Sequence, residues 1–291
     1  MPLVKVAGIQ MSCSSDIDKN LEKCINLIEL AAERGANVIC LQELFNTLWF
    51  PKDSNPENFA LAEKVDGKTI RLLKGVAKKT GTVIIAPFFE KGIDGIYYNS
   101  AVVIDEKGQL VGTYRKVHVP QLPMYEESFY FSAGDLGFPV FDTSYGKIGI
   151  QICWDNFYPE GIRSLALKGA QIVFAPTAAA FASHEKWKTV LSASAITNGL
   201  YVFRVNRVGN EDSHNFYGEA FCVNPLGEMV ERPSGMGDGI YEVDIDLSMV
   251  EKTRQDYPYL KNRRPELYGP IAGQKTVVEK KIKKIVREKK D

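Results

Sequence analysis

The sequence predicts a single α/β domain built around a mixed β-sheet. Three observations support this: short apolar runs alternate with amphipathic helical patterns, hairpins are inserted among them, and no linker or internal repeat interrupts the pattern. Strands that alternate with helices favour a parallel sheet, whereas hairpins add antiparallel strands. With 291 residues, the chain is long enough to bury a large core.

The first third of the chain predicts alternating strands and helices. A helix is expected over residues 20–36, because Leu21, Cys24 and Ile28 recur at helical spacing and Gly35 can end it. The other expected elements are strands over 4–11, 37–44 and 82–90, and a second helix over 67–81 that also ends at a glycine.

The rest of the chain contains hairpins as well as further strand–helix units. Residues 99–119 predict two strands joined by a turn at Asp105–Gly108, and 138–153 predict a strand pair with Gly146 in the turn. The remaining elements follow in order: a strand, helix and strand over 146–178, a helix over 184–200, strands within 201–209, 216–231 and 239–247, and a closing helix over 248–263.

Composition and charge favour a small-molecule protein of the cytoplasm. The formal net charge is zero, and no apolar run reaches the roughly 18 residues of a membrane span, so neither nucleic acid nor a membrane is expected as a partner. Five scattered cysteines form no disulfide framework, and three separated histidines show no metal-ligand spacing. A domain is expected over 1–271, followed by a basic tail over 272–291.

Three predicted strands carry a reactive side chain near their ends. These are Glu43 in NVICLQEL, Lys116 in the strand Val111–Val119, and Cys153 at the end of GKIGIQIC. Sites in α/β sheets gather at the carboxyl ends of strands, but strand order cannot be read from the sequence. Each residue also has an ordinary interpretation: a solvated helix start, an edge lysine and a buried thiol. The strand-to-helix corner at Cys153 favours a nucleophile, because such corners present a side chain to a cavity and N–H groups to an oxyanion.

Three motifs resemble those of a known family. LQELF around Glu43, YRKVHVP around Lys116 and ICWDNFYPE around Cys153 resemble, in order and wide spacing, the motifs of the nitrilase superfamily of carbon–nitrogen hydrolases. The resemblance runs from Val4 to about Tyr268. It implies a four-layer α-β-β-α sandwich with two mixed β-sheets, no cofactor, and subunits that pair into a homodimer or a larger homo-oligomer.

The resemblance also implies a Glu43–Lys116–Cys153 triad. Glu43 would take the thiol proton as Cys153 attacks a carbonyl carbon, and Lys116 with the backbone N–H of Trp154 would stabilise the oxyanion. A second glutamate usually follows the lysine motif. The aromatic run FYF in MYEESFYFSAGD assigns that role to Glu127, which would orient Lys116 or the substrate.

The residues also allow His118, in place of Glu43, as the base that takes the proton of the Cys153 thiol. If Val117 lies in a strand, His118 shares a face with Lys116 and could pair with Cys153 instead. A packing or surface role for His118 is the other interpretation.

Within the family, the motifs favour the amide and carbamoyl branches. Asp155 follows Cys-Trp, where nitrilases more often show Glu-His. The segments CWDNFYPEGIR and NFYGEAFCVNPLGE most resemble N-carbamoylputrescine amidohydrolases and β-ureidopropionase-like members, which release ammonia and carbon dioxide from a ureido group.

The leaving amine stays undefined. The segment APTAAAFAS offers no acid for a cationic amine, whereas Arg204 and Arg207 are available for a carboxylate or for ordinary ion pairs. The predicted substrate-binding residues are Trp49, Tyr125, Trp154, Phe157 and Thr177.

Three other functions compete with a carbamoyl or amide hydrolase. A nitrilase would share the triad and act on a nitrile. A non-enzymatic interaction protein could keep the fold, although intact Glu43, Lys116 and Cys153 argue against it. A redox thiol protein is the weakest alternative, because no resolving cysteine lies near Cys153 in sequence.

Overall fold

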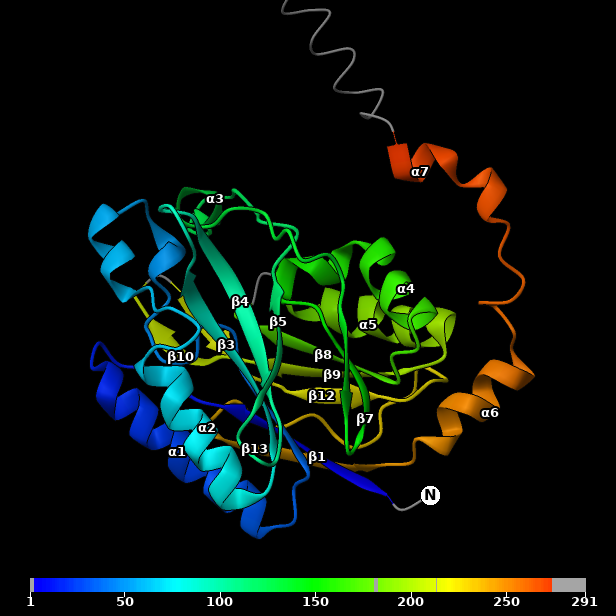
Figure 1. Ribbon diagram of the computed structural model, residues 1–291, viewed down its shortest axis with the longest axis horizontal. Helices are drawn as coiled ribbons and strands as arrows, with labels where there is room; N and C mark the ends of the chain where they lie inside the picture. Colours follow the sequence, from blue (N-terminus) through cyan, green and yellow to red (C-terminus); the bar gives the residue numbers. More distant parts are fainter. Residues whose placement is uncertain (1–2, 181–182, 213, 274–291) are drawn as a thin grey trace, which may run out of the picture. The chain divides into compact units, whose positions relative to one another are not determined.

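The computed structural model describes residues 3–180, 183–212 and 214–273 (Figure 1). The chain divides into two compact units, Met1–Tyr257 and Pro258–Asp291. The first unit holds both large sheets and every predicted site residue. The second contains two short helices, η5 (Pro265–Leu267) and α7 (Gly269–Gly273). Almost all of the predicted basic tail, from residue 274 onward, lies outside the described residues.

The first sheet is mixed and has six strands in the order β13-β1-β2-β3-β4-β5. The strands β1, β2 and β3 are parallel, while β13, β4 and β5 join as antiparallel neighbours. Their bounds are β1 Val4–Gln10, β2 Val38–Leu41, β3 Val83–Lys91, β4 Tyr97–Ile104, β5 Leu110–Arg115 and β13 Gly239–Ile245. The central strands are almost fully buried, as the apolar runs predict.

The second sheet is also mixed and has five strands in the order β12-β9-β8-β7-β6. Here β7, β8 and β9 are parallel, and the outer strands β6 and β12 are antiparallel. The bounds are β6 Val140–Thr143, β7 Gly146–Ile150, β8 Ile172–Thr177, β9 Tyr201–Asn206 and β12 Phe221–Val223, and a separate hairpin joins β10 Val208–Glu211 to β11 His214–Tyr217.

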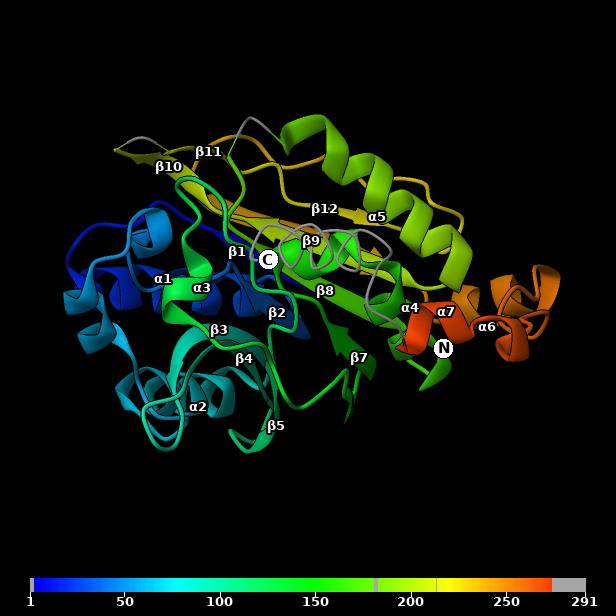
Figure 2. The same ribbon diagram turned by 90° about the horizontal axis from the view of Figure 1, so that it is seen from above.

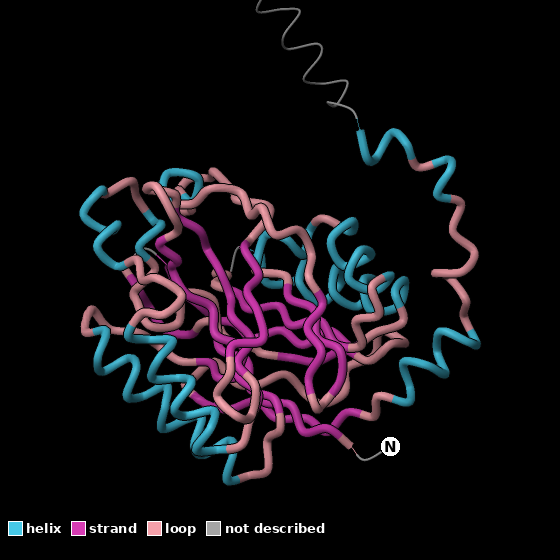
Figure 3. The backbone as a smooth tube through the Cα atoms, in the orientation of Figure 1, coloured by secondary structure: helices cyan, strands magenta, loops and turns pink. Residues whose placement is uncertain are grey.

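The two sheets pack face to face between two layers of helices (Figures 1 and 2). At Gly8 of β1, an added Cβ would lie 2.7 Å from Val205 and 2.8 Å from Phe203 of β9, so glycine permits the close approach of the sheets. Helices α1 (Ile17–Glu33) and α2 (Lys68–Thr80) cover the first sheet, and α4 (Pro159–Leu167) and α5 (His184–Asn198) cover the second. Figure 3 shows the strands gathered between the helices. The predicted α-β-β-α sandwich is confirmed.

The helix ends follow local signals in the sequence. The carboxylate of Asp16 accepts the N–H groups of Asp18 and Lys19, so α1 begins three residues earlier than expected. Gly35 and Gly81 adopt positive φ angles of 90° and 67° just after α1 and α2, which glycine allows without steric cost. Both predicted helix ends are therefore confirmed.

Two predicted elements are shorter in the structure. The strand expected to reach Val119 ends at Arg115, so the expectation that His118 shares a strand face with Lys116 is wrong. The closing helix α6 (Ser248–Asp256) stops well before residue 263. Tyr257 precedes a proline, and that position disfavours helical backbone. Among the described residues of the first unit, four short helices were not predicted: η1 (Phe50–Lys52), η2 (Pro56–Leu61), α3 (Glu127–Tyr130) and η3 (Cys153–Phe157).

Among the residues that the structure describes, no helix combines the length and apolar character that a membrane span requires.

Candidate active site

Three loops that follow strands of both sheets meet at one buried cluster. Glu43 follows β2, Lys116 follows β5 directly, and Cys153 follows β7 at the start of η3. The Nζ of Lys116 donates to Oε1 of Glu43 at 2.9 Å and to Oε2 of Glu127 at 2.6 Å. All three of these side chains are fully buried. The structure therefore brings Glu43, Lys116 and Glu127 together, as the family resemblance implied.

Cys153 sits at a strained corner of the backbone. Its φ angle is +45°, in the left-handed region that costs a residue with a side chain about 1–2 kcal/mol. The amide of Asn156 holds the corner by donating to the carbonyls of Cys153 and Gln151 at 2.9 and 3.0 Å. The thiol is buried, and the backbone N–H of Ala178 is directed at it. The corner thus presents the sulfur to the interior, where few groups can solvate a thiolate.

The charges around the thiol favour its protonated form. Burial and the neighbouring carboxylate of Glu43 raise the pKa of Cys153 well above its usual range, while Lys116 lowers it. Burial lowers the pKa of Lys116, but Glu127 and Glu43 outweigh that effect and keep it above its usual value. The resting cluster therefore contains a neutral thiol beside a charged lysine, so the thiol must lose its proton as it attacks.

Asn99 is a member of the cluster that the sequence analysis missed. Its side-chain amide, on β4, donates to Oε1 of Glu43 at 2.8 Å, the same oxygen that Lys116 contacts. A buried asparagine in the apolar strand YYNSAVVI was the available signal, because a buried amide needs a partner. Oε2 of Glu43 has no partner among the described residues and remains free for a proton.

Glu127 is the carboxylate whose titration the cluster alters most visibly. Desolvation raises its pKa to about 7 from 4.5, with Lys116 lowering it and Glu43 raising it further. A folded-state pKa above the unfolded one stabilises the fold below pH 4.5, and this stabilisation is lost as the pH rises through about 7.

Glu127→Gln is therefore expected to gain stability relative to wild type as the pH rises. The amide stays neutral, and its oxygen can still accept from Lys116. Urea unfolding at pH 5 and at pH 8 measures the difference, with Glu126→Gln as the control at a half-buried neighbour. An equal difference at both pH values would show that Glu127 carries no altered titration.

Asp155 ties the nucleophile loop to the lysine loop. Its buried carboxylate accepts the backbone N–H of Ile152 at 3.1 Å and the backbone N–H of His118 at 2.9 Å. It also accepts the hydroxyl of Tyr114 at 2.6 Å. These donors flank Cys153 on one chain segment and Lys116 on the other, so one carboxylate fixes the distance between thiol and ammonium.

Asp155→Asn is expected to lower kcat by about 100-fold, because a displacement of about 1 Å between reacting groups has that effect. The variant should also lose about 2–4 kcal/mol of stability, since an amide N–H₂ would face buried donors. Steady-state kinetics and urea unfolding check both effects. Asp142→Asn, at an exposed residue of β6, is the matched control. Wild-type kcat in a folded Asp155→Asn protein would contradict this positioning role.

His118 is engaged by the same aspartate. Its Nδ1 lies 2.8 Å from Oδ1 of Asp155, and its ring stacks on Tyr158 with centroids 3.7 Å apart. Glu43, Lys116 and Glu127 are the charged groups that mainly shift the pKa of the Cys153 thiol, and His118 is not one of them. The alternative Cys153–His118 dyad is therefore not supported.

A cavity of about 540 Å³ opens beside Cys153 and Glu127. Most of its described wall is apolar or aromatic. Of the predicted substrate-binding residues, Tyr125, Trp154 and Phe157 line it. Its size and apolar wall suit a small organic molecule.

Trp49 and Thr177 lie behind this wall. Trp49 is almost fully buried, packs against Tyr125 with centroids 5.4 Å apart, and donates its indole N–H to the carbonyl of Met124. The hydroxyl of Thr177 donates to the carbonyl of Ala175 at 2.9 Å. Both residues support the wall and do not line the cavity, so substrate contact by either remains only a prediction.

Arg204 and Arg207 are buried structural residues. Arg207 donates to the carbonyls of Thr47 and Leu44 and pairs with Glu211 at 2.6 Å. Arg204 donates to the hydroxyl of Tyr217 at 2.9 Å. Neither lines the cavity, so the hypothesis that they hold a substrate carboxylate is not supported. Instead, Arg207 braces the chain just after Glu43.

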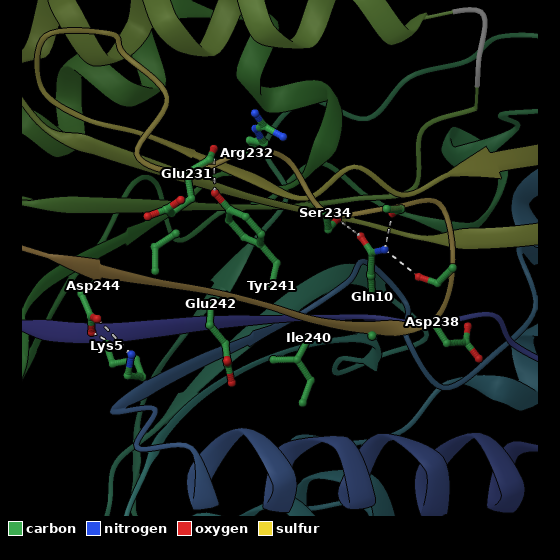
Figure 4. A pocket seen from close by; sticks show the side chains of 14 residues that line it. Lys5, Gln10, Glu231, Arg232, Ser234, Asp238, Ile240, Tyr241, Glu242 and Asp244 are labelled. Atoms are coloured by element: carbon green, nitrogen blue, oxygen red, sulfur yellow. Dashed lines mark hydrogen bonds and ion pairs between the residues drawn. The ribbon is translucent and has the colours of Figure 1, made fainter.

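A second hollow lies along the edge strand β13 (Figure 4). Its central polar group is Gln10, whose amide nitrogen donates to the carbonyls of Gly235 and Gly237, both at 2.7 Å. Ser234 donates to the amide oxygen of Gln10 at 2.6 Å. These bonds anchor a loop on the strand edge. Because no thiol lines this hollow, the candidate active site is the cavity beside Cys153.

Within the described part of the chain, no group of three or more histidine, cysteine or acidic side chains is arranged to hold a metal ion. Two histidines are paired with carboxylates: His118 with Asp155, and His184 with Glu185 and Glu219.

Comparisons with known proteins agree with this fold. An N-carbamoylputrescine amidase of Solanum tuberosum is 36% identical over 282 residues, covering 91% of this chain and 94% of the relative. A citrullinase of Francisella tularensis is 37% identical over 284 residues, covering 93% and 99%. The crystal structure of a carbon-nitrogen hydrolase from Helicobacter pylori G27 matches with a TM-score of 0.90 and 35% identity, covering 94% of this chain and all of that one.

The fold and these relatives define the class: an α-β-β-α hydrolase that acts on carbon–nitrogen bonds other than peptide bonds. The family model described as carbon-nitrogen hydrolase matches residues 5–255. The chain belongs to the carbon-nitrogen hydrolase family, within the nitrilase superfamily.

Proposed function

We propose that the protein is a thiol amidohydrolase that cleaves a small N-carbamoyl or linear amide substrate. The observation that carries this proposal is the buried Glu43–Lys116–Glu127 cluster, whose Glu127 lines the same cavity as the Cys153 thiol. A nucleophile that faces a cavity, with a carboxylate base and a cation buried near it, supplies the parts that acyl transfer needs.

In the proposed first half-reaction, Cys153 attacks the carbonyl carbon. Because the thiol rests protonated, Glu43 takes its proton during the attack through its free Oε2. Negative charge develops on the carbonyl oxygen, where Lys116 and the backbone N–H of Trp154 stabilise it. One such donor is worth about 3 kcal/mol of barrier. Glu43 then returns the proton to the departing nitrogen, and ammonia leaves a thioester-type acyl-enzyme.

In the second half-reaction, the same carboxylate activates a water molecule. The water attacks the acyl carbon, the carbon–sulfur bond breaks, and Glu43 returns a proton to the thiolate. An amide substrate yields a carboxylic acid. A ureido substrate yields a carbamate, which loses carbon dioxide and leaves an amine. Glu127 keeps Lys116 in place throughout.

The relatives support a ureido substrate. Two of them are named for N-carbamoylputrescine and citrulline, both of which carry a terminal ureido group. The alternative is a nitrilase, which would use the same cluster to hydrolyse a nitrile to a carboxylic acid and ammonia.

Ammonia release from a matched panel tests the proposal. The panel contains N-butylurea, N-carbamoylputrescine, N-carbamoyl-β-alanine, L-citrulline, butyramide and butyronitrile. We expect turnover of a ureido or amide compound, and carbon dioxide release with the ureido compounds alone. Turnover of the nitrile alone would assign the alternative, and no turnover of any compound would contradict both.

We also propose that the protein is a cytoplasmic homo-oligomer. The five cysteines are free of disulfides, which suits a reducing compartment. Light scattering would measure the subunit number.

A further inference from the structure

A single lysine enters the wall of the reaction cavity. Lys186, in the first turn of α5, is the only lysine or arginine among the described residues that line the cavity. No described residue forms an ion pair or hydrogen bond with it. Neighbouring charges on α5 are paired: His184 contacts Glu185 and Glu219, and Lys188 lies 3.6 Å from Glu219. Lys186 is therefore the unneutralised charge at the cavity.

The described wall of the cavity contains no free carboxylate that could form an ion pair with Lys186. Glu127 is the only carboxylate in its described wall, and the Nζ of Lys116 already contacts it at 2.6 Å. A substrate with a cationic end would thus meet Lys186 and find no free counter-charge. A substrate with an anionic end would meet an available cation.

The backbone of α5 adds to the same preference. Ser183 is the N-cap of this 15-residue helix and lines the cavity together with Lys186, yet its side chain makes no capping bond. Helix N-termini carry unpaired N–H groups and a partial positive charge, which disfavour a lysine and favour an anion. An anion bound here would accept hydrogen bonds from the free N–H groups and form an ion pair with Lys186.

His214 of β11 lines the same cavity and independently indicates a polar ligand there. The residue is 2% exposed, and neither ring nitrogen makes a hydrogen bond of normal geometry to the described residues, although the carbonyl of Met124 lies near the ring. Desolvation lowers its pKa, and the nearby carbonyl of Met124 opposes this only in part. Tyr125 and Phe216 pack against the ring at 5.1 and 5.3 Å. An unpaired buried polar group costs about 1–3 kcal/mol, which a polar atom of a ligand would recover.

We propose that the substrate carries a carboxylate at the end away from the scissile bond, so that it is an ω-ureido or ω-amido carboxylate. Lys186 and the first turn of α5 bind the carboxylate, and His214 hydrogen-bonds a polar atom of the bound molecule. This inference rests on the proposed function and narrows it, because it excludes a cationic amine such as N-carbamoylputrescine as the preferred substrate.

The test compares kcat/KM for three ureido compounds of similar length: N-carbamoyl-γ-aminobutyrate, N-carbamoylputrescine and neutral N-butylurea. Wild type should prefer the carboxylate over the cation. Lys186→Glu should lower the carboxylate-to-cation ratio by about 30-fold, as expected when a solvated charge contact is reversed, and leave N-butylurea within about twofold. Lys188→Met, which removes a lysine of the same helix outside the cavity, should leave the ratio unchanged.

His214→Phe keeps an aromatic ring but removes both nitrogens. It should raise KM for the carboxylate compound by about 10-fold, the loss expected for one hydrogen bond, with little change in kcat.

Three outcomes would overturn this assignment while the proposed function stands: wild type preferring the cation, an unchanged ratio in Lys186→Glu, or an unchanged KM in His214→Phe. Each requires measurable turnover of a ureido compound. If no ureido compound, amide or nitrile is turned over at all, the proposed function fails as well.

Discussion

Cys153→Ala is expected to lose turnover while its fold is preserved. Without the sulfur no acyl-enzyme can form, and removal of a nucleophile of this kind lowers kcat by about 10⁴-fold or more. The substitution deletes one atom at the edge of an existing cavity, so it should cost only about 1 kcal/mol of stability. Ammonia release and urea unfolding measure the two quantities.

Cys222→Ala is the matched control. That thiol is fully buried on β12, so its loss also removes one buried sulfur, and full kcat is expected. Labelling provides a second readout. In wild type, an amide electrophile such as iodoacetamide should alkylate Cys153 before the other cysteines. Mass spectrometry of the labelled peptides would detect this order. Ammonia release by Cys153→Ala at the wild-type rate would rule out the mechanism.

Lys116→Met is expected to damage both stability and activity. The lysine lies between two buried carboxylates, at 2.9 Å from Glu43 and 2.6 Å from Glu127. Removing one member of a buried ion cluster leaves uncompensated charge and costs about 3–5 kcal/mol. The oxyanion also loses its charged donor, which lowers kcat by about 10²–10³-fold or more.

The stability loss should depend on pH. Glu127, whose pKa is already raised to about 7 beside the lysine, loses its main stabilising charge in the variant. Its proton is then held more tightly in the folded than in the unfolded chain, so the variant loses stability as the pH rises. The deficit relative to wild type should therefore be larger at pH 8 than at pH 5, by urea unfolding.

A double variant separates the two effects of Lys116. Lys116→Met with Glu127→Gln removes one of the two facing carboxylates, so it should recover part of the lost stability but none of the lost kcat. Lys147→Met, at a half-exposed lysine of β7 whose contact with Asp142 is 3.6 Å, should change stability by about 0.5 kcal/mol or less. A Lys116→Met protein as stable and as active as wild type would contradict the role of the cluster.

Much of the fold could be predicted from local patterns. Apolar runs located the strands, helical spacing of Leu21, Cys24 and Ile28 located α1, and Gly35 and Gly81 marked helix ends. Each of these signals depends on a few neighbouring residues, so it can be recognised without knowing the tertiary structure. The end of β5 was misplaced because a distant carboxylate, Asp155, binds the N–H of His118.

The candidate reactive residues could also be chosen from the sequence. The motifs around Glu43, Lys116 and Cys153 indicated the family, and the aromatic run after the lysine motif selected Glu127. Their mutual distances were not accessible, because they depend on strand order in two different sheets. The structure joins three of these side chains by hydrogen bonds.

The sequence by itself therefore determined the strands, most helix ends and the family, and it indicated the candidate reactive side chains, since each is encoded in contiguous residues. Only the tertiary structure decided what surrounds those side chains. Arg204 and Arg207 bond to other buried groups and do not line the cavity, whereas Lys186 and His214 do. Asp155 bonds to the chain segments beside Cys153 and beside Lys116. The physical reason is that burial, desolvation and hydrogen-bond pairing are set by neighbours that are distant along the chain.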